Sequence, residues 1–277
     1  MASDQLELGQ SYICTTCGMQ YARTAQPPEA CVICQDSRQY VGFDGQQWTT
    51  LRELQSTHGN MIQQEEPGLY SIHTQPAFAI GERAFLLQTP KGNVLWDCVS
   101  LIDETTIQKI DKLGGVAAIA ISHPHYYTTM IEWSLAFDDA PIHLHSADRR
   151  WVLRPHRNVQ FWGGDNKKLM DDITLIHTPG HFEGYQVLHW PAGAAGKGVL
   201  LSGDQPQVCW DLRWVSFMYS YPNYLPLGRN AVDDIVRRLD GYEFDRIHGA
   251  FPRRTVWRDA KDIVRQSAER FLKAISA

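Results

Sequence analysis

The chain has 277 residues, 43% of them hydrophobic and 21% charged, and its formal net charge is −5 at pH 7. A chain of this length and composition can form one large globular domain with a sizeable core, alone or with a small appendage. The negative net charge gives no reason to expect a nucleic acid as a partner, and since no stretch approaches about 18 consecutive apolar residues, no membrane span is predicted. The polar N-terminus, Met-Ala-Ser-Asp-Gln-Leu-Glu, lacks the charged and apolar regions of a signal peptide, so we expect a cytoplasmic protein.

Four cysteines near the N-terminus have the spacing of a metal site. Cys14 and Cys17 form one C-x-x-C pair, and Cys31 and Cys34 form another, close to the arrangement of four-thiolate sites. In a cytosolic chain this pattern favours a metal over disulfides. A segment of about 40 residues has too small a core to fold alone, so metal ligation would supply its folding energy. Zinc and iron both take four thiolates, and we predict a structural zinc.

The first cysteine pair, followed by Gly18 and Tyr21, resembles a rubredoxin or a zinc ribbon, whereas the second has Gln35 where a glycine would be expected. We therefore predict a rubredoxin-like zinc ribbon over residues 1–42 and a second domain over residues 43–277. Since the ribbon and the second domain share no ligand, we expect them to bind metal independently.

The predicted ribbon carries more negative than positive charge. Its two basic and four acidic residues are Arg23, Arg38, Asp4, Glu7, Glu29 and Asp36. A surface that follows phosphates needs the opposite sign. The ribbon is therefore expected to be a lid, a contact within a homo-oligomer or a protein-docking module, and not a nucleic-acid binder.

The next part of the chain predicts strands around one helix. A capping box, Thr50-Leu-Arg-Glu53, opens a short helix that ends near residue 58. Alternating and apolar runs then predict strands, and an amphipathic segment with a closing glycine predicts a helix. The predicted strands are 69–73, 77–80, 84–87 and 94–97, and the helix is 103–113.

Residues 116–121 form an unbroken apolar run, which predicts a strand that is buried on both faces. His123 and His125 follow it. Because side chains two residues apart in an extended segment point the same way, both imidazoles would face one side of the strand's end. An isolated pair of this kind is either a chelate or a solvent-exposed strand end.

Three later strands end in the same way. The short strands at 173–176, 198–201 and 244–247 are followed by His181 in Thr-Pro-Gly-His, Asp204 in Ser-Gly-Asp and His248. Strand ends that gather along one edge of a sheet would bring these groups together. Three imidazoles and a carboxylate suit zinc, iron or manganese.

The remaining segments have mainly structural interpretations. A second capping box, Thr129 to Glu132, predicts a helix through residue 136. A strand at 141–145 carries a further histidine pair, His143 and His145, which we interpret as structural. Arginines at 149–157 form a salt-bridged face or bind a substrate carboxylate or phosphate. The aromatic stretch 208–227, with a strand expected over 213–221, is core or dimer packing, or a wall of a substrate pocket. Helices are predicted at 231–239 and 260–275.

The order of these motifs resembles the metallo-β-lactamase superfamily over roughly residues 60–277. That resemblance implies an α/β four-layer αβ/βα sandwich in which His123, His125 and His181 hold one metal. Asp204 would bridge to a second metal, to which His248 would belong. The family motif H-x-H-x-D-H is broken here, because Tyr127 and Thr128 occupy its last two positions. We therefore expect one tightly bound metal at this site, with His248 as a spare or weak ligand.

These features predict a metal-dependent hydrolase that acts on a small-molecule ester, thioester, amide or related substrate. The metal, zinc or else iron or manganese, would activate a water molecule, and Asp204 would be the fourth ligand or the catalytic base. Two alternatives stay open. One is a mononuclear non-haem iron oxygenase that uses only His123, His181 and Asp204. The other is a weakly active or non-catalytic scaffold that binds a protein partner.

Overall fold

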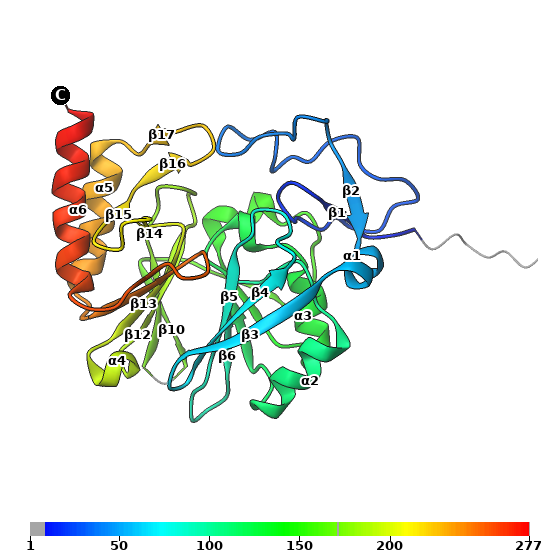
Figure 1. The fold of residues 1–277 in the computed structure, drawn as a ribbon, viewed down its shortest axis with the longest axis horizontal. Helices are drawn as coiled ribbons and strands as arrows, with labels where there is room; N and C mark the ends of the chain where they lie inside the picture. Colours follow the sequence, from blue (N-terminus) through cyan, green and yellow to red (C-terminus); the bar gives the residue numbers. More distant parts are fainter. Residues whose placement is uncertain (1–8, 171, 277) are drawn as a thin grey trace, which may run out of the picture.

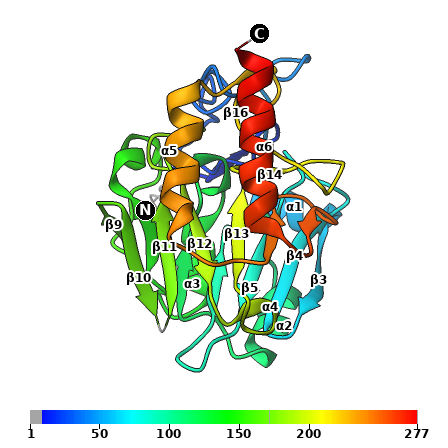
Figure 2. The ribbon, with the colours of Figure 1, turned by 90° about the vertical axis from the view of Figure 1, so that its left-hand side faces the viewer.

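The computed structural model describes residues 9–170 and 172–276, so residues 1–8 of the predicted ribbon lie outside the described part. Two mixed sheets lie between two layers of helices, as Figures 1 and 2 show. The predicted four-layer sandwich, with a small four-cysteine ribbon at its N-terminal end, is confirmed.

The seven-stranded sheet has its strands in chain order, antiparallel from β3 to β6 and parallel from β6 to β9. Its strands are β3 (Gly59–Glu66), β4 (Leu69–Gln75), β5 (Arg83–Leu87), β6 (Val94–Trp96), β7 (Ala118–Ala120), β8 (Ile142–His145) and β9 (Val159–Trp162). Parallel strands need a crossover, which α2 (Glu104–Lys112) and α3 (Met130–Ala136) provide in this sheet.

The six-stranded sheet has the order β10-β11-β12-β13-β18-β19. Its strands are β10 (Asn166–Met170), β11 (Ile173–His177), β12 (Gln186–Trp190), β13 (Val199–Gly203), β18 (Arg246–Gly249) and β19 (Thr255–Val256). Only β13 and β18 run parallel in it. Their connection contains α5 (Arg229–Asp240), which packs with the last helix, α6 (Ala260–Ile275), on the outer face of this sheet (Figure 2).

Two cores follow from the alternation of side chains along the strands. Phe85 and Leu87 of β5 pack with Val199 and Leu201 of β13 in a core between the sheets. Leu86 and Leu200 are the neighbours of these residues in the same two strands, and they belong to the larger core that includes the helices. The same larger core contains all four cysteines of the ribbon.

The ribbon is built on a two-stranded sheet, in which β1 (Tyr12–Cys14) pairs with β2 (Trp48–Thr50). It lies along one end of the sandwich and reaches from α1 (Leu51–Thr57) to the hairpin of β16 (Met218–Ser220) and β17 (Leu225–Pro226) (Figure 1). The amide of Asn223 in that hairpin donates to the carbonyl oxygens of Ser37 and Gln39. The division of the chain at residue 42 stays a prediction.

Some predicted elements differ from the structure. The Thr50 capping box is present, with Glu53 N 3.3 Å from Thr50 Oγ1. The one at Thr129 is not, because its hydroxyl donates instead to the carbonyl oxygens of Val99 and Ser100. Residues 77–80 form no strand, since Ala79 and Gly81 have positive φ and turn the chain.

Short elements complete the described chain. In place of one strand over 213–221, β15 (Val215–Ser216) pairs with β14 (Gln207–Val208), and β16 belongs to a separate hairpin. The short helices are α4 (Gly193–Gly196) and the 3-10 turns η1 (Pro124–Tyr126) and η2 (Ser146–Trp151). No helix in the described ranges is long and apolar enough to cross a membrane.

Candidate metal centre

The four cysteines of the ribbon converge as predicted. Their sulfur atoms lie within 4.8 Å of one another and are buried; Cys14 Sγ is 3.5 Å from Cys34 Sγ, and Cys17 Sγ is 3.5 Å from Cys31 Sγ. All four are free thiols in the structure. The arrangement fits one tetrahedral metal ion and not two disulfides.

Both cysteine pairs make the same turn with different residues. After the first pair, Gly18 N donates to Cys14 O at 2.8 Å, and the positive φ of +78° requires a glycine. After the second pair, Gln35 N donates to Cys31 O at 3.0 Å, and Gln35 is not among the residues with positive φ. The missing glycine in the second pair therefore does not prevent the turn.

Three histidines and one aspartate form the second cluster, at the ends of β7, β11 and β13 as the sequence predicts. The ligand atoms of His123, His125, His181 and Asp204 lie within 4.8 Å of one another. The side chains of all four residues are buried. Asp204 Oδ2 is 3.4 Å from His123 Nε2.

The same nitrogen of each histidine is left without a partner. Nε2 of His123, His125 and His181 is buried and has no hydrogen bond within the described residues. Burial lowers the pKa of His181 to about 4 and the pKa values of His123 and His125 well below the usual value, so the rings are neutral near pH 7. Unpaired buried polar atoms are costly, and three neutral imidazoles beside a carboxylate are the donor set that a divalent cation takes. The cluster fits a metal ion.

Other side chains fix the histidine rings. His123 Nδ1 is 2.9 Å from Ser122 Oγ, which donates to Asp97 Oδ1 at 2.8 Å. His181 Nδ1 is 3.1 Å from the carbonyl oxygen of Met218. Metal-binding histidines usually donate their other N–H in this way, which orients the ring and leaves the ligating nitrogen free.

A buried glutamine joins the His181 and Asp204 loops. Gln205 Oε1 accepts from His181 N at 2.6 Å, and its Nε2 donates to Thr178 O at 2.5 Å. Gly180 fits beside this amide because a Cβ there would lie 2.6 Å from Gln205 Oε1. Asp204 is held as well, since its Oδ1 accepts from Gln207 Nε2 at 2.9 Å.

Comparison with known proteins identifies the family of the chain. No family model matches it. A protein of Bacillus subtilis strain 168, described as the uncharacterized protein YmaE, is 47% identical over 268 residues, which are 96% of this chain and 97% of that protein. The chain belongs to the YmaE family.

Solved structures that are similar to this chain of the YmaE family identify its fold. The protein TMB-1 aligns over 79% of this chain and 99% of its own length, at 13% identity and a TM-score of 0.58. The metallo-β-lactamase DIM-1 aligns over 78% of this chain and 97% of its own length, at 12% identity and a TM-score of 0.57. A metallo-β-lactamase of Cronobacter sakazakii aligns over 81% of this chain and 96% of its own length, at 17% identity and a TM-score of 0.53. The chain has the metallo-β-lactamase fold.

His248, predicted as a spare ligand, is not part of the cluster. Its Nε2 lies 2.8 Å from Glu66 Oε1 and its Nδ1 lies 3.1 Å from Thr255 Oγ1. Although burial opposes ionisation of Glu66, its hydrogen bonds with His248 and Arg246 hold its pKa at about 2. Both nitrogens of the His248 ring are therefore engaged by the carboxylate and the hydroxyl, which corrects the prediction.

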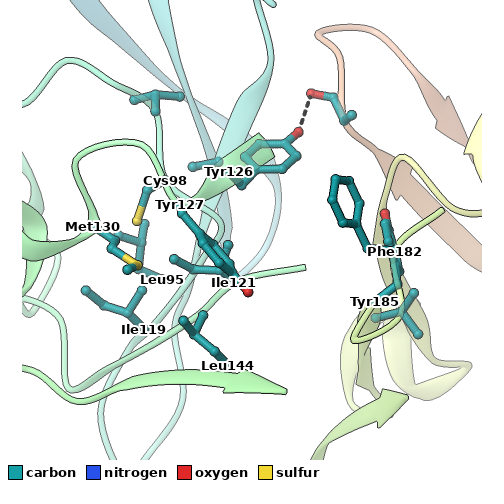
Figure 3. Packing of buried hydrophobic residues seen from close by; sticks show 14 of the residues in the cluster. Leu95, Cys98, Ile119, Ile121, Tyr126, Tyr127, Met130, Leu144, Phe182 and Tyr185 are labelled. Carbon is teal, nitrogen blue, oxygen red and sulfur yellow. Dashed lines mark hydrogen bonds between the residues drawn. The ribbon is translucent and has the colours of Figure 1, made fainter. Parts of the chain in front are cut away.

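The two positions that break the family motif face other groups. Tyr127 is buried beside Leu95, Cys98, Ile121 and Leu144, on the side away from Phe182 and Tyr185 (Figure 3). Thr128 donates from Oγ1 to Cys98 O at 3.2 Å.

Aromatic rings surround the histidines. The Tyr185 ring stacks on His123 at 4.8 Å, and the Phe182 ring lies 5.5, 5.0 and 5.2 Å from the rings of His123, His125 and His181. The Tyr126 ring contacts His123 at 5.4 Å while its hydroxyl bonds to Ala250 O (Figure 3). These rings keep the ligand side chains out of bulk water.

The second histidine pair and the arginines have partners outside the cluster. His145 stacks on His177 at 3.8 Å, away from the cluster. Arginines of the 149–157 stretch form ion pairs: Arg150 with Glu183, Arg154 with Glu132 and Arg157 with Asp139.

Sequence reasoning missed Asp97 and Gln205. Asp97 directly follows the buried strand β6, which is the position in which the predicted ligands follow their own strands. The position of Asp97 after a strand was therefore a usable sequence signal. No sequence signal marks Gln205, because its function depends on a contact with His181, 24 residues away.

Proposed function

We propose that the chain is a metal-dependent hydrolase with one metal at the histidine cluster and a structural zinc at the four cysteines. The observation that carries the proposal is the set of three unpaired, buried Nε2 atoms beside the Asp204 carboxylate. The fold adds support, since two of the compared structures, DIM-1 and the protein of Cronobacter sakazakii, are named metallo-β-lactamases.

The residues of the cluster have separate tasks. His123, His125 and His181 would bind the ion through Nε2, and Asp204 would offer Oδ2 as fourth ligand. When bound, the ion supplies Lewis acidity and lowers the pKa of a coordinated water from about 15.7 toward 7. Asp204 is the only carboxylate of the cluster in the described chain and is the candidate base.

The surroundings favour this chemistry over the alternatives. Phe182 and Tyr185 exclude water from the ligands, which strengthens electrostatic interactions inside the site. His125 lies in the cluster with the other two histidines, and this argues against an oxygenase triad of two histidines and one carboxylate. A complete ligand set argues against a non-catalytic scaffold. We propose a small-molecule ester, thioester, amide or related compound as substrate.

The test combines metal analysis with a substrate panel. Protein purified without added metal is analysed for zinc, iron and manganese, and then assayed on simple esters, thioesters, amides and β-lactams. His181→Ala and Asp204→Asn should lose turnover by about 100-fold or more, whereas His58→Ala, outside the cluster, should keep it. A protein without metal at the cluster, or turnover that survives both changes, would contradict the proposal.

A further inference from the structure

Arg38 connects the ribbon with the loop that carries His181. It follows Cys34 by four positions and is 5% exposed. Its Nε donates to the carbonyl oxygen of His181 at 2.7 Å. Its other nitrogens pair with Asp36 Oδ1 at 2.9 Å and with Glu183 Oε1 at 3.1 Å. One ribbon side chain thus touches the backbone of a candidate metal ligand.

The guanidinium also stacks on the rings around the site. Its carbon lies 4.5 Å from the centre of the Phe182 ring and 4.7 Å from that of Tyr219. Phe182 in turn contacts the rings of the three histidines. The next residue after Tyr219, Ser220, donates to Arg38 O at 3.0 Å. Arg38 therefore holds both the His181 loop and the strand β16, whose Met218 carbonyl orients the His181 ring.

The other end of the contact depends on the cysteines. The turn after Cys31 and Cys34 leads directly to Asp36, whose Oδ1 accepts from Arg38 N at 3.0 Å. Asp36 N bonds to Ile33 O at 3.3 Å, and Gln39 N bonds to Asp36 O at 3.0 Å. Arg38 is therefore fixed by the same turn that presents Cys31 and Cys34. In so small a segment, metal ligation supplies much of the folding energy.

We propose that Arg38 is a positioning residue through which metal binding at the four cysteines strengthens metal binding at the histidine cluster. The inference rests on the cluster being a metal site, as proposed above, and not on the reaction that it performs. It departs from the independence that the sequence predicts. Because such coupling is reciprocal, loss of either metal weakens retention of the other.

The first experiment measures the affinity of the histidine cluster for zinc by competition with a chelator, with the four-cysteine site loaded. Arg38→Gln should weaken this affinity about 10- to 100-fold, as removal of groups that orient ligands usually does. Arg150→Gln is the matched control, since Arg150 also pairs with Glu183 at 3.1 Å but its side chain is 62% exposed. Equal effects of the two changes, or none from Arg38→Gln, would overturn the proposal.

A second readout separates positioning from loss of stability. Co²⁺ is placed in the histidine cluster with zinc retained at the cysteines, and its visible absorption is recorded. Arg38→Gln should change this spectrum, and Arg38→Lys should restore it only in part, because an ammonium cannot both donate in a fixed plane and stack on Phe182. A lower melting temperature with an unchanged spectrum would mean that Arg38 is merely structural.

A double-mutant cycle tests the connection to the cysteines. Cys34→Ser should weaken zinc binding at the histidine cluster, and adding Arg38→Gln should weaken it no further, because both changes break one pathway. Losses that multiply, or a Cys34→Ser protein with unchanged affinity, would contradict the coupling. A wild-type protein that binds no metal at the cluster would instead overturn the proposed function.

Discussion

Gln205 Oε1 accepts a 2.6 Å hydrogen bond from the backbone nitrogen of His181. Gln205 follows Asp204 in the chain, so one side chain sets the distance between two candidate ligands that come from different strands. We predict that Gln205→Ala weakens metal binding at the histidine cluster about 10- to 100-fold. It should also lower the free energy of unfolding by about 1–3 kcal/mol, because His181 N and Thr178 O lose their buried partner. Chelator competition and urea unfolding measure the two effects.

Gln207→Ala is the matched control for this prediction. The side-chain amide of Gln207 donates to Asp204 Oδ1, and its loss should affect the affinity less than the loss of the Gln205 amide does. An equal loss in both variants would mean that the Asp204 carboxylate, and not the His181 loop, is the sensitive part of the site.

Asp97 is expected to orient His123 through Ser122. Asp97→Ala removes the single oxygen, Oδ1, that accepts from both Ser122 N and Ser122 Oγ, at 2.6 and 2.8 Å. We predict weaker metal binding by about 10-fold or more, with the visible spectrum of Co²⁺ at the cluster changed. Ser122→Ala should act in the same direction. Unchanged spectra in both variants would show that His123 needs no support from this chain of hydrogen bonds.

The candidate ligands were predictable because each stands shortly after the end of a strand, and these strand ends meet at one edge of the sheets. His123, His125, His181 and Asp204 needed no knowledge of the packing. His248 follows the same rule, yet its partner Glu66 lies 182 residues away and no local pattern reveals it. From the sequence alone, Arg38 is an ordinary charged residue of the ribbon. Its contact with His181, which lies 143 residues later in the chain, is visible only in the structure. Local periodicity thus predicts strands and ligands, whereas contacts between distant segments decide which side chains are free.

Asp148 should make stability depend on pH. Burial, together with the negative charge of Glu183, raises its pKa from 3.8 to about 7. The unfolded chain releases this proton near pH 4 and the folded protein keeps it to about pH 7, so the free energy of unfolding falls as the pH rises between these values. The loss is on the order of 3–4 kcal/mol for a shift of this size.

Asp148→Asn removes this titration and keeps an acceptor for Gly184 N, which now bonds to Asp148 Oδ1 at 2.8 Å. Relative to wild type, the variant should gain stability as the pH rises from 4 to 8, as urea unfolding measures. Asp233→Asn makes the same exchange of residue type at an exposed position of α5 and is the control for that exchange. A stability difference between Asp148→Asn and wild type that does not change with pH would mean that the Asp148 carboxyl ionises normally.

Metal content should be about two equivalents per chain after dialysis against a weak chelator. One belongs to the four cysteines and the other to the histidine cluster, since these are the two groups of ligands that the described residues bring together. His181→Ala should retain about one equivalent. Three equivalents in the wild type would reveal a further site, which neither His248 nor Thr128 supplies in this structure.

The last prediction concerns the broken family motif. Tyr127→Asp combined with Thr128→His restores the residue types of the motif, but we predict no third metal. Tyr127 fills the apolar space near Leu95 and Leu144 (Figure 3), so its replacement leaves a cavity that costs on the order of 3 kcal/mol or more and buries a carboxylate. His248 stays engaged with Glu66, which removes the remaining ligand of a second site.

Tyr127→Phe keeps the ring volume and is the control for stability. Metal titration of the folded double variant, with and without Glu66→Gln to release His248, decides the matter. Uptake of a third equivalent would show that positions 127 and 128 reach the metal after all, and that side-chain size alone keeps the second site from forming.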